Sequence, residues 1–161
     1  MKRLVAVCGP GGDVAAELAQ AAEQVGALLA AAGVDVVTGG LDGVMAAAAR
    51  GARAAGGRAI GVLPGADARA GNEYLSVALP TGLGELRNGL VVSAADAVIA
   101  VGGSWGTLSE IALAARAAKP VVVLRGWQIR DEAGRPVPIA TADDAEAAVA
   151  FVVTALRAVD D

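Results

Sequence analysis

The stretch Ala97-Val-Ile-Ala-Val-Gly-Gly-Ser-Trp-Gly-Thr-Leu-Ser-Glu110 decides the fold of this chain. An apolar, β-branched run ends in a glycine-rich turn, and a helical pattern follows from Leu108 to Ala118. Thr107 and Glu110 have the spacing of a capping box, in which each side chain satisfies one free N–H at a helix start. Such a strand, turn and helix direct backbone N–H groups and the positive end of the helix dipole at one small volume, which suits a phosphate.

Apolar strands alternate with helical patterns on both sides of this stretch. Strands are predicted at 4–8, 34–38, 59–63, 75–78, 97–101 and 121–124. Because each is apolar on both faces and a helix separates most of them, the pattern indicates the α/β class. We therefore predict one domain over residues 1–161, with a doubly wound (Rossmann-like) parallel sheet of about six or seven strands and helices on both faces.

Local signals give finer predictions. Asp13 is expected to cap the first helix, and residues 126–140 are expected to be irregular, with a turn at 130–134 between short extended arms. The helix before the central strand is expected to place its larger apolar side chains on one face. These are Leu83, Leu86, Leu90 and Val91.

Three glycine-rich turns follow predicted strands, at 9–12, 39–43 and 102–106. Ligands of doubly wound sheets bind beyond the carboxyl ends of the strands, so the three turns should meet at one crevice. The first turn lacks the G-x-G-x-x-G pattern of dinucleotide-binding proteins, and taken alone it is equally typical of a tight connection.

Composition excludes several classes of function. The net charge of −4 and the pI near 4.8 argue against a nucleic-acid surface, although a small anion held by local N–H groups is still allowed. Histidine is absent and Cys8 is the single cysteine, so we predict no metal site, no histidine-based triad and no disulfide. The N-terminal apolar run is too short for a signal peptide, no segment is long enough to span a membrane, and a cytoplasmic location is expected.

Several candidate residues also have simpler interpretations. Thr107 and Glu110 could serve only as a helix cap, and Arg87 could lie on a solvated helix face. Met45 suits a core and Cys8 a buried small apolar position. Trp105, inside the central turn, either stacks on a ligand or packs at a subunit interface.

Several motifs, in order along most of the chain, resemble the LOG-like (SLOG) superfamily, whose members were once labelled lysine decarboxylases. Residues 38–52, Thr-Gly-Gly-Leu-Asp-Gly-Val-Met-Ala-Ala-Ala-Ala-Arg-Gly-Ala, resemble its G-G-x-x-G-v-M-x-A-x-x-x-G-A helix start, and Gly57-Arg-Ala-Ile-Gly-Val-Leu-Pro64 resembles its third strand. Arg87 matches the helix arginine, and residues 103–110 resemble P-G-G-x-G-T-x-x-E.

Within the superfamily, Arg87-Asn88 and residues 101–110 are most similar to the branch that contains molybdenum cofactor carrier proteins. The branch that hydrolyses cytokinin riboside monophosphates usually has Arg-Lys and a proline-led glycine motif. Here Asn88 replaces the lysine, Gly102 the proline and Ser104 a glycine. The resemblance therefore implies a binding or carrier protein for a nucleotide or a molybdopterin-type cofactor, with a nucleoside 5′-monophosphate phosphoribohydrolase as the alternative.

The resemblance also implies roles for residues. Gly103, Gly106 and Thr107 would hold a phosphate, and in a hydrolase Arg87 and Glu110 would be the catalytic pair. The full ligand-binding set that it implies is Gly9, Gly39, Gly40, Gly43, Met45, Gly102, Gly103, Ser104, Trp105, Gly106 and Thr107. No cofactor is required. Pyridoxal phosphate chemistry is excluded because the two lysines lie at the N-terminus and at a helix end before Pro120. A homodimer or homotetramer is expected.

Overall fold

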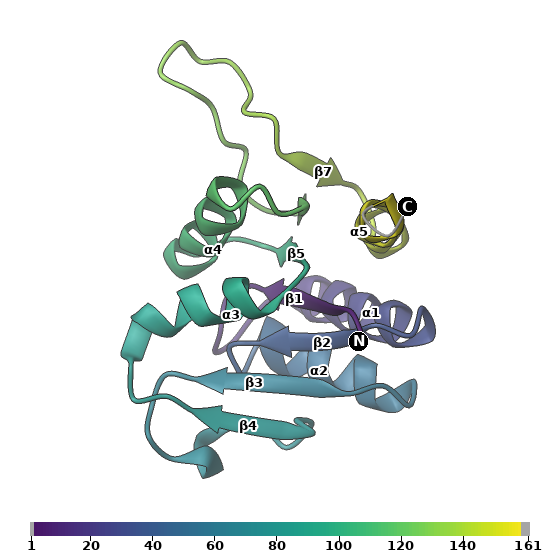
Figure 1. Cartoon of the computed structure of the whole chain (residues 1–161), viewed down its shortest axis with the longest axis vertical. Helices are drawn as coiled ribbons and strands as arrows, with labels where there is room; N and C mark the ends of the chain where they lie inside the picture. The colour runs from purple at the N-terminus through teal and green to yellow at the C-terminus, as the bar shows by residue number, and fades with distance from the viewer. Residues whose placement is uncertain (1, 159–161) are drawn as a thin grey trace.

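Seven strands form one parallel sheet in the order β4-β3-β2-β1-β5-β6-β7 in the computed structural model, which describes residues 2–158 (Figure 1). The order runs outward in both directions from the neighbours β1 and β5, which confirms the predicted doubly wound, Rossmann-like α/β fold. The strands are β1 (Leu4–Cys8), β2 (Asp35–Thr38), β3 (Ala59–Leu63), β4 (Val77–Pro80), β5 (Ala97–Val101), β6 (Val121–Leu124) and β7 (Ala140–Ala142).

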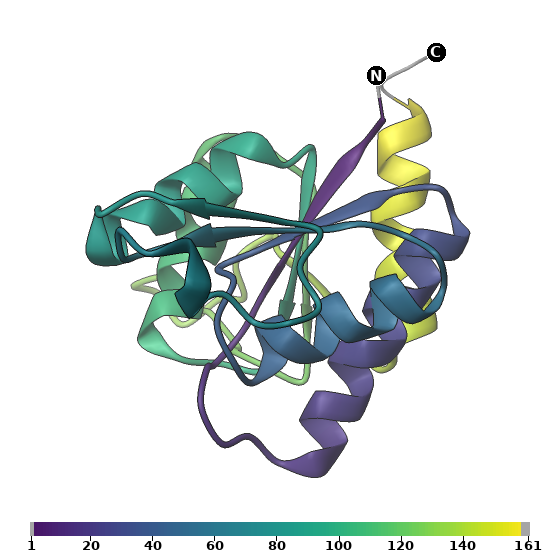
Figure 2. The same cartoon turned by 90° about the horizontal axis from the view of Figure 1, so that it is seen from below.

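Helices cover both faces of the sheet (Figure 2). α1, α2 and α5 pack on one face, and α3 and α4 pack on the other. The helices are α1 (Ala16–Ala31), α2 (Val44–Ala54), α3 (Asn88–Ala94), α4 (Trp105–Arg116) and α5 (Ala145–Ala158), with short 3₁₀ turns η1 (Ala68–Ala70) and η2 (Gly84–Arg87). None of these helices, within residues 2–158, has the length and apolar character that a bilayer crossing needs.

The central strands are apolar on both sides because both sides are covered. In β1, Val5 and Val7 pack toward α1 and α2, whereas Ala6 and Cys8 pack toward α3 and α4. All five residues of β5 are buried. A parallel sheet with helices on both faces requires this continuous burial, which explains why its strands lack an apolar–polar alternation.

The backbones of α1 and α2 come into close contact, because glycines lie where the two helices cross. A Cβ on Gly26 would lie 2.0 Å from the carbonyl oxygen of Ala48, and one on Gly51 would lie 1.9 Å from that of Glu23. With few aromatic side chains in the chain, such close backbone contact supplies the dispersion energy that larger residues would otherwise give.

The finer sequence predictions are partly wrong. α1 begins at Ala16 with Ala15 at its N-cap, so Asp13 does not cap it. The predicted leucine face is divided, because Val91 is fully buried while Leu86 is 80% exposed. The turn predicted at 130–134 between short extended arms is confirmed: an Arg130–Pro136 bridge joins the two arms, and residues 125–139 form a hairpin arm that extends from the body of the protein (Figure 1).

Candidate functional site

The glycine turns after β1 and β2 and the first turn of α4 meet at one cavity of about 510 Å³. The cavity lies at the carboxyl ends of the strands. It is next to the neighbours β1 and β5, where the strand order reverses. We call it the glycine cleft. Residues of the predicted binding set that line it are Gly9, Gly39, Met45, Ser104, Trp105, Gly106 and Thr107. The expectation that the three turns meet at one crevice is confirmed.

The helix that faces the cleft begins earlier than its sequence suggests. α4 starts at Trp105, and its N-cap is Ser104, whose Oγ accepts the Thr107 N–H at 3.2 Å. The predicted capping box of Thr107 and Glu110 is therefore wrong, since both residues lie inside the helix and are buried. Ser104 has φ −140° and ψ 172°, an extended conformation open to any residue, so the serine causes no backbone strain here.

The first turn of α4 points at the cleft. The helix leaves the N–H groups of Trp105 and Gly106 without intrahelical acceptors, and the positive end of the helix dipole adds to them. A Cβ at Gly106 would contact only Asn88 Nδ2 at 3.6 Å and Ser104 Oγ at 3.8 Å, both ordinary contacts. The protein itself therefore has room for a larger residue at position 106, and the glycine keeps the cleft open.

The other glycines of the predicted set serve the protein's own packing. Gly39 lies against the Arg87 guanidinium, and a Cβ there would approach Nη2 to 2.5 Å. Gly40, Gly43 and Gly102 have φ values of 78°, 65° and 73°, and Gly103 packs under the Trp127 ring. Gly40, Gly43, Gly102 and Gly103 do not line the cleft; a positive φ at the first three and the contact with Trp127 at Gly103 account for a glycine at each position.

Arg87 is buried, and its partners hold it in place. Its Nη1 donates to Asn88 Oδ1 and lies 4.0 Å from Glu110 Oε1. Nε is buried and has no hydrogen-bond partner among the described residues. The interpretation of Arg87 as a solvated surface residue is therefore wrong.

Asn88 links this arginine to the opposite helix. Its Nδ2 donates to Ser109 Oγ at 3.2 Å, and the Ser109 hydroxyl donates to the Gly106 carbonyl at 2.6 Å. The chain of hydrogen bonds runs from Arg87 across α3 to the first turn of α4. The position of the guanidinium is thus tied to the backbone that lines the cleft.

Glu110 carries an unusual carboxyl group. Burial raises its pKa, the Cys8 thiol that donates to it and the Arg87 charge lower the pKa, and the Glu85 charge raises it again, for a net pKa of about 7. Burial and the neighbouring Glu110 carboxyl raise the pKa of the Cys8 thiol. The pair is therefore a carboxyl group that titrates near neutral pH beside a thiol that stays protonated.

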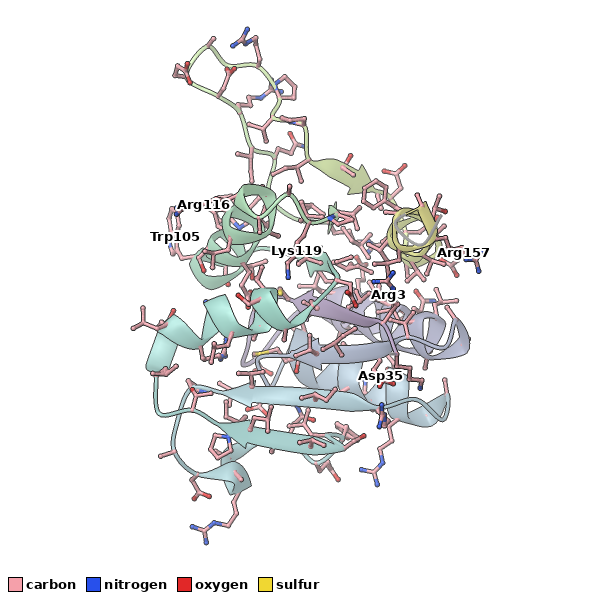
Figure 3. The ribbon with its side chains drawn as sticks, in the orientation of Figure 1. Arg3, Asp35, Trp105, Arg116, Lys119 and Arg157 are labelled. Carbon is pink, nitrogen blue, oxygen red and sulfur yellow. The ribbon has the colours of Figure 1, made fainter. Side chains whose placement is uncertain are left out.

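Two tryptophans pack against each other at the start of α4. Trp105 is 79% exposed, and the centroid of its ring lies 5.4 Å from that of Trp127 at an interplanar angle of 41°. Trp127 Nε1 donates to the Ser104 carbonyl at 3.1 Å, so it holds the residue that caps α4. Figure 3 shows Trp105 projecting away from the sheet at the start of α4.

Sequence reasoning missed several residues of the cleft. Cys8 was predicted to be buried, which is correct, but its contact with Glu110 was not foreseen. Asn88 appeared only as a departure from the family pattern, and nothing local predicts its bonds to Arg87 and Ser109. The remaining lining residues without a predicted role are Gly11, Leu41, Pro64, Gly84 and Glu85.

The sheet order and the glycine cleft at its switch point define a Rossmann-like protein. Residues 2–153 match the model of the SLOG cluster4 family, and the chain belongs to that family. An uncharacterized protein of Archaeoglobus fulgidus is 37% identical over 124 residues, which cover 73% of this chain and 82% of that protein.

Two solved structures are similar over nearly their whole length. The Moco carrier protein of Chlamydomonas reinhardtii is 35% identical, with a TM-score of 0.86 over 98% of this chain and 99% of the other. The molybdenum cofactor binding protein of the phototrophic bacterium Rippkaea orientalis is 31% identical, with a TM-score of 0.84 over 100% and 99%. The similarity that the sequence motifs indicated, to the branch with molybdenum cofactor carriers, is confirmed.

Proposed function

We propose that this protein binds and carries a phosphorylated, molybdopterin-type cofactor in the glycine cleft. The observation that carries the proposal is the open first turn of α4: Gly106 has room for a side chain, and the turn presents free N–H groups to a cavity of about 510 Å³. The structural similarity to molybdenum cofactor carriers supports this choice of ligand.

The cleft offers the chemistry that such a cargo needs. Its phosphate would accept the N–H groups of Trp105 and Gly106 and the Thr107 hydroxyl at the positive end of the α4 dipole. Arg87 also lines the cavity and adds a positive charge. Leu41, Met45 and Pro64 supply apolar lining for a flat ring system.

A direct test measures binding of the isolated cofactor by its pterin fluorescence. We expect saturable binding at one cofactor per chain and at least a roughly tenfold loss of affinity in Thr107→Val, which removes the hydroxyl and keeps the side-chain shape. The matched control is Thr154→Val on the exposed side of α5, which should bind as the wild type does. Equal affinity in both variants would contradict the proposed site.

A second candidate function is hydrolysis of a nucleoside 5′-monophosphate to free base and ribose 5-phosphate. The observation in its favour is the buried pair of Arg87 and Glu110, 4.0 Å apart, with the pKa of Glu110 at about 7. A carboxyl that titrates near neutrality could stabilise a developing oxocarbenium ion or position water. Release of free adenine from AMP, abolished in Glu110→Gln, would establish the enzyme; retained cofactor binding without base release would favour the carrier.

We further propose that the chain forms a homodimer or homotetramer through the surface around α3. Leu83, Leu86 and Leu90 are all exposed there, and Trp105 lies exposed at the start of α4. A cluster of exposed apolar side chains on a small protein is typical of an interface. Sedimentation should give a mass of at least two chains, and Leu86→Glu should shift it toward one chain.

A further inference from the structure

A second cavity lies outside the glycine cleft, beneath the hairpin arm. It has a volume of about 450 Å³, within the range typical of small-molecule sites. The arm that lines it is held together by its own contacts: Asp131 accepts the N–H groups of Ala133 and Arg135 at 2.9 Å, and Arg135 pairs with Asp131 at 2.8 Å. We call it the hairpin cavity.

Two arginines bring positive charge to this cavity. Arg125 follows β6, and Arg130 lies on the arm, where its Nη1 donates to the Gly134 carbonyl at 2.9 Å; both arginines line the cavity, as does Thr141. The chain as a whole carries a net charge of −4, so this concentration of guanidinium groups is a local feature. Arginine forks match the oxygens of a phosphate or a carboxylate.

Arg125 occupies its position at a cost to the backbone. Its φ is 53°, in the left-handed region that favours glycine. Its ion pair with Glu17 spans 3.6 Å, and the Glu17 side chain is 87% exposed, so solvent screens the attraction. An arginine kept in a conformation suited to glycine, with only a weak partner, indicates a role for the guanidinium itself.

The cavity also has a fixed aromatic wall. The Trp127 side chain lines it, and the hydrogen bond from Nε1 to the Ser104 carbonyl fixes the orientation of the ring. Apolar contacts come from Ile129 and Ile139, and Asp143 adds a carboxylate that can accept amino hydrogens. These features match a nucleotide. The indole ring can stack on the base, the arginines can bind the phosphate, and the Asp143 carboxylate can accept from an amino group of the base.

We propose that the hairpin cavity is a second ligand site, which binds a nucleoside monophosphate with the phosphate on Arg125 and Arg130 and the base against Trp127. The site is separate from the glycine cleft, and its occupation does not depend on the function proposed for the cleft. The two sites share the Trp127–Ser104 contact as a common wall.

The test titrates AMP into the protein and follows the indole N–H resonances of the two tryptophans, assigned with Trp105→Phe. We expect saturable movement of the Trp127 signal. Arg125→Gly should weaken AMP binding at least about tenfold while the Tm stays equal or rises, because glycine accepts the left-handed φ without strain. Arg130→Ala should also weaken it, and Arg116→Ala, an exposed arginine on α4, is the control for lost charge.

Thr107→Val separates this site from the glycine cleft. AMP binding at the hairpin cavity should survive that substitution, even if the cofactor no longer binds in the cleft. The proposal is overturned if AMP leaves the Trp127 signal unmoved, if Arg125→Gly binds AMP as tightly as the wild type, or if Thr107→Val abolishes the binding.

Discussion

Two buried carboxylates at opposite edges of the sheet differ sharply in their surroundings. Asp35 lies at the amino edge, where its oxygens accept from Lys2 Nζ at 3.0 Å and from Arg58 Nε at 3.0 Å. Glu110 lies at the carboxyl edge, and its cation, Arg87, is 4.0 Å away and already bonded to Asn88. In Figure 3 the labels of Asp35 and Trp105 mark these two edges.

Their pKa values move in opposite directions as a result. Burial raises the pKa of Asp35, but the hydrogen bonds and charges of Arg58 and Lys2 outweigh it, so the pKa lies below its ordinary value. Burial dominates at Glu110 and brings its pKa to about 7. The amino edge is electrostatically satisfied, whereas the carboxyl edge keeps a carboxyl group and a cation that are incompletely paired and available to a ligand.

The largest expected effect is a dependence of stability on pH that comes from Glu110. Its folded pKa of about 7 exceeds 4.5, the ordinary pKa of a glutamate, so between these pH values the folded state holds a proton that the unfolded state has lost. Stability should therefore fall as pH rises through this window, by about 3 kcal/mol, and level off above it. Denaturant unfolding at pH 5 and pH 8 measures the difference.

Glu110→Gln is the control for this pH effect. The amide cannot ionise, so the decline between pH 5 and pH 8 should largely disappear, and the variant should be at least as stable as the wild type at pH 8. A decline of the same size in both proteins would mean that another group causes it, and would remove the contrast between the two edges.

Asp35→Asn should lower stability, whereas Glu110→Gln should not, and the size of the change should be smaller than the pH effect at Glu110. The amide loses the charge-assisted bonds to Lys2 and Arg58, and because both cations are more than half exposed, the loss of unfolding free energy should be about 2 kcal/mol at pH 7. Asp67→Asn, in an exposed pair with Arg69, should change stability little. An Asp35→Asn variant as stable as wild type would show that the amino edge does not need its ion pairs.

The sequence predicted the parallel sheet and the meeting of its glycine turns, but not the residue that caps α4. Strand–helix alternation predicted the parallel sheet, and because parallel strands end at one edge, it also predicted that distant glycine turns would meet. The capping-box rule favoured Thr107, which has Glu110 three residues later, over Ser104, which has Thr107 there, yet Ser104 is the N-cap. The choice depends on where the end of β5 places the helix.

Contacts between helices could not be predicted from the sequence, because they too depend on how the elements are placed in the fold. The Asn88–Ser109 hydrogen bond joins α3 to α4, and the Trp105–Trp127 pair joins α4 to the hairpin arm. Neither pair has a spacing that a periodic pattern would reveal. The family resemblance identified Arg87 and Glu110 as a pair, but the weak coupling that leaves Glu110 with a pKa of about 7 is visible only in the structure.

Asn88→Ala should have a smaller effect on the pH dependence of stability than Glu110→Gln. Without the Asn88 acceptor, Nη1 of Arg87 is free to approach Glu110, so the pKa of Glu110 should fall and the decline in stability between pH 5 and pH 8 should shrink by about 1 kcal/mol. Ser109→Ala removes only the outer bond of Asn88 and should have less effect. NMR titration of the Glu110 carboxyl measures this; an unchanged pKa would contradict the role of Asn88.

Cofactor binding by Gly106→Ala tests most directly whether the first turn of α4 holds the phosphorylated ligand. The added methyl meets only ordinary contacts within the protein, and alanine favours a helix, so stability should be unchanged or higher by up to about 1 kcal/mol. The same methyl would occupy the space where the phosphate approaches the N–H groups, so affinity should fall at least about tenfold. A stable Gly106→Ala protein that binds the cofactor as tightly as the wild type would show that the first turn of α4 does not hold its phosphate.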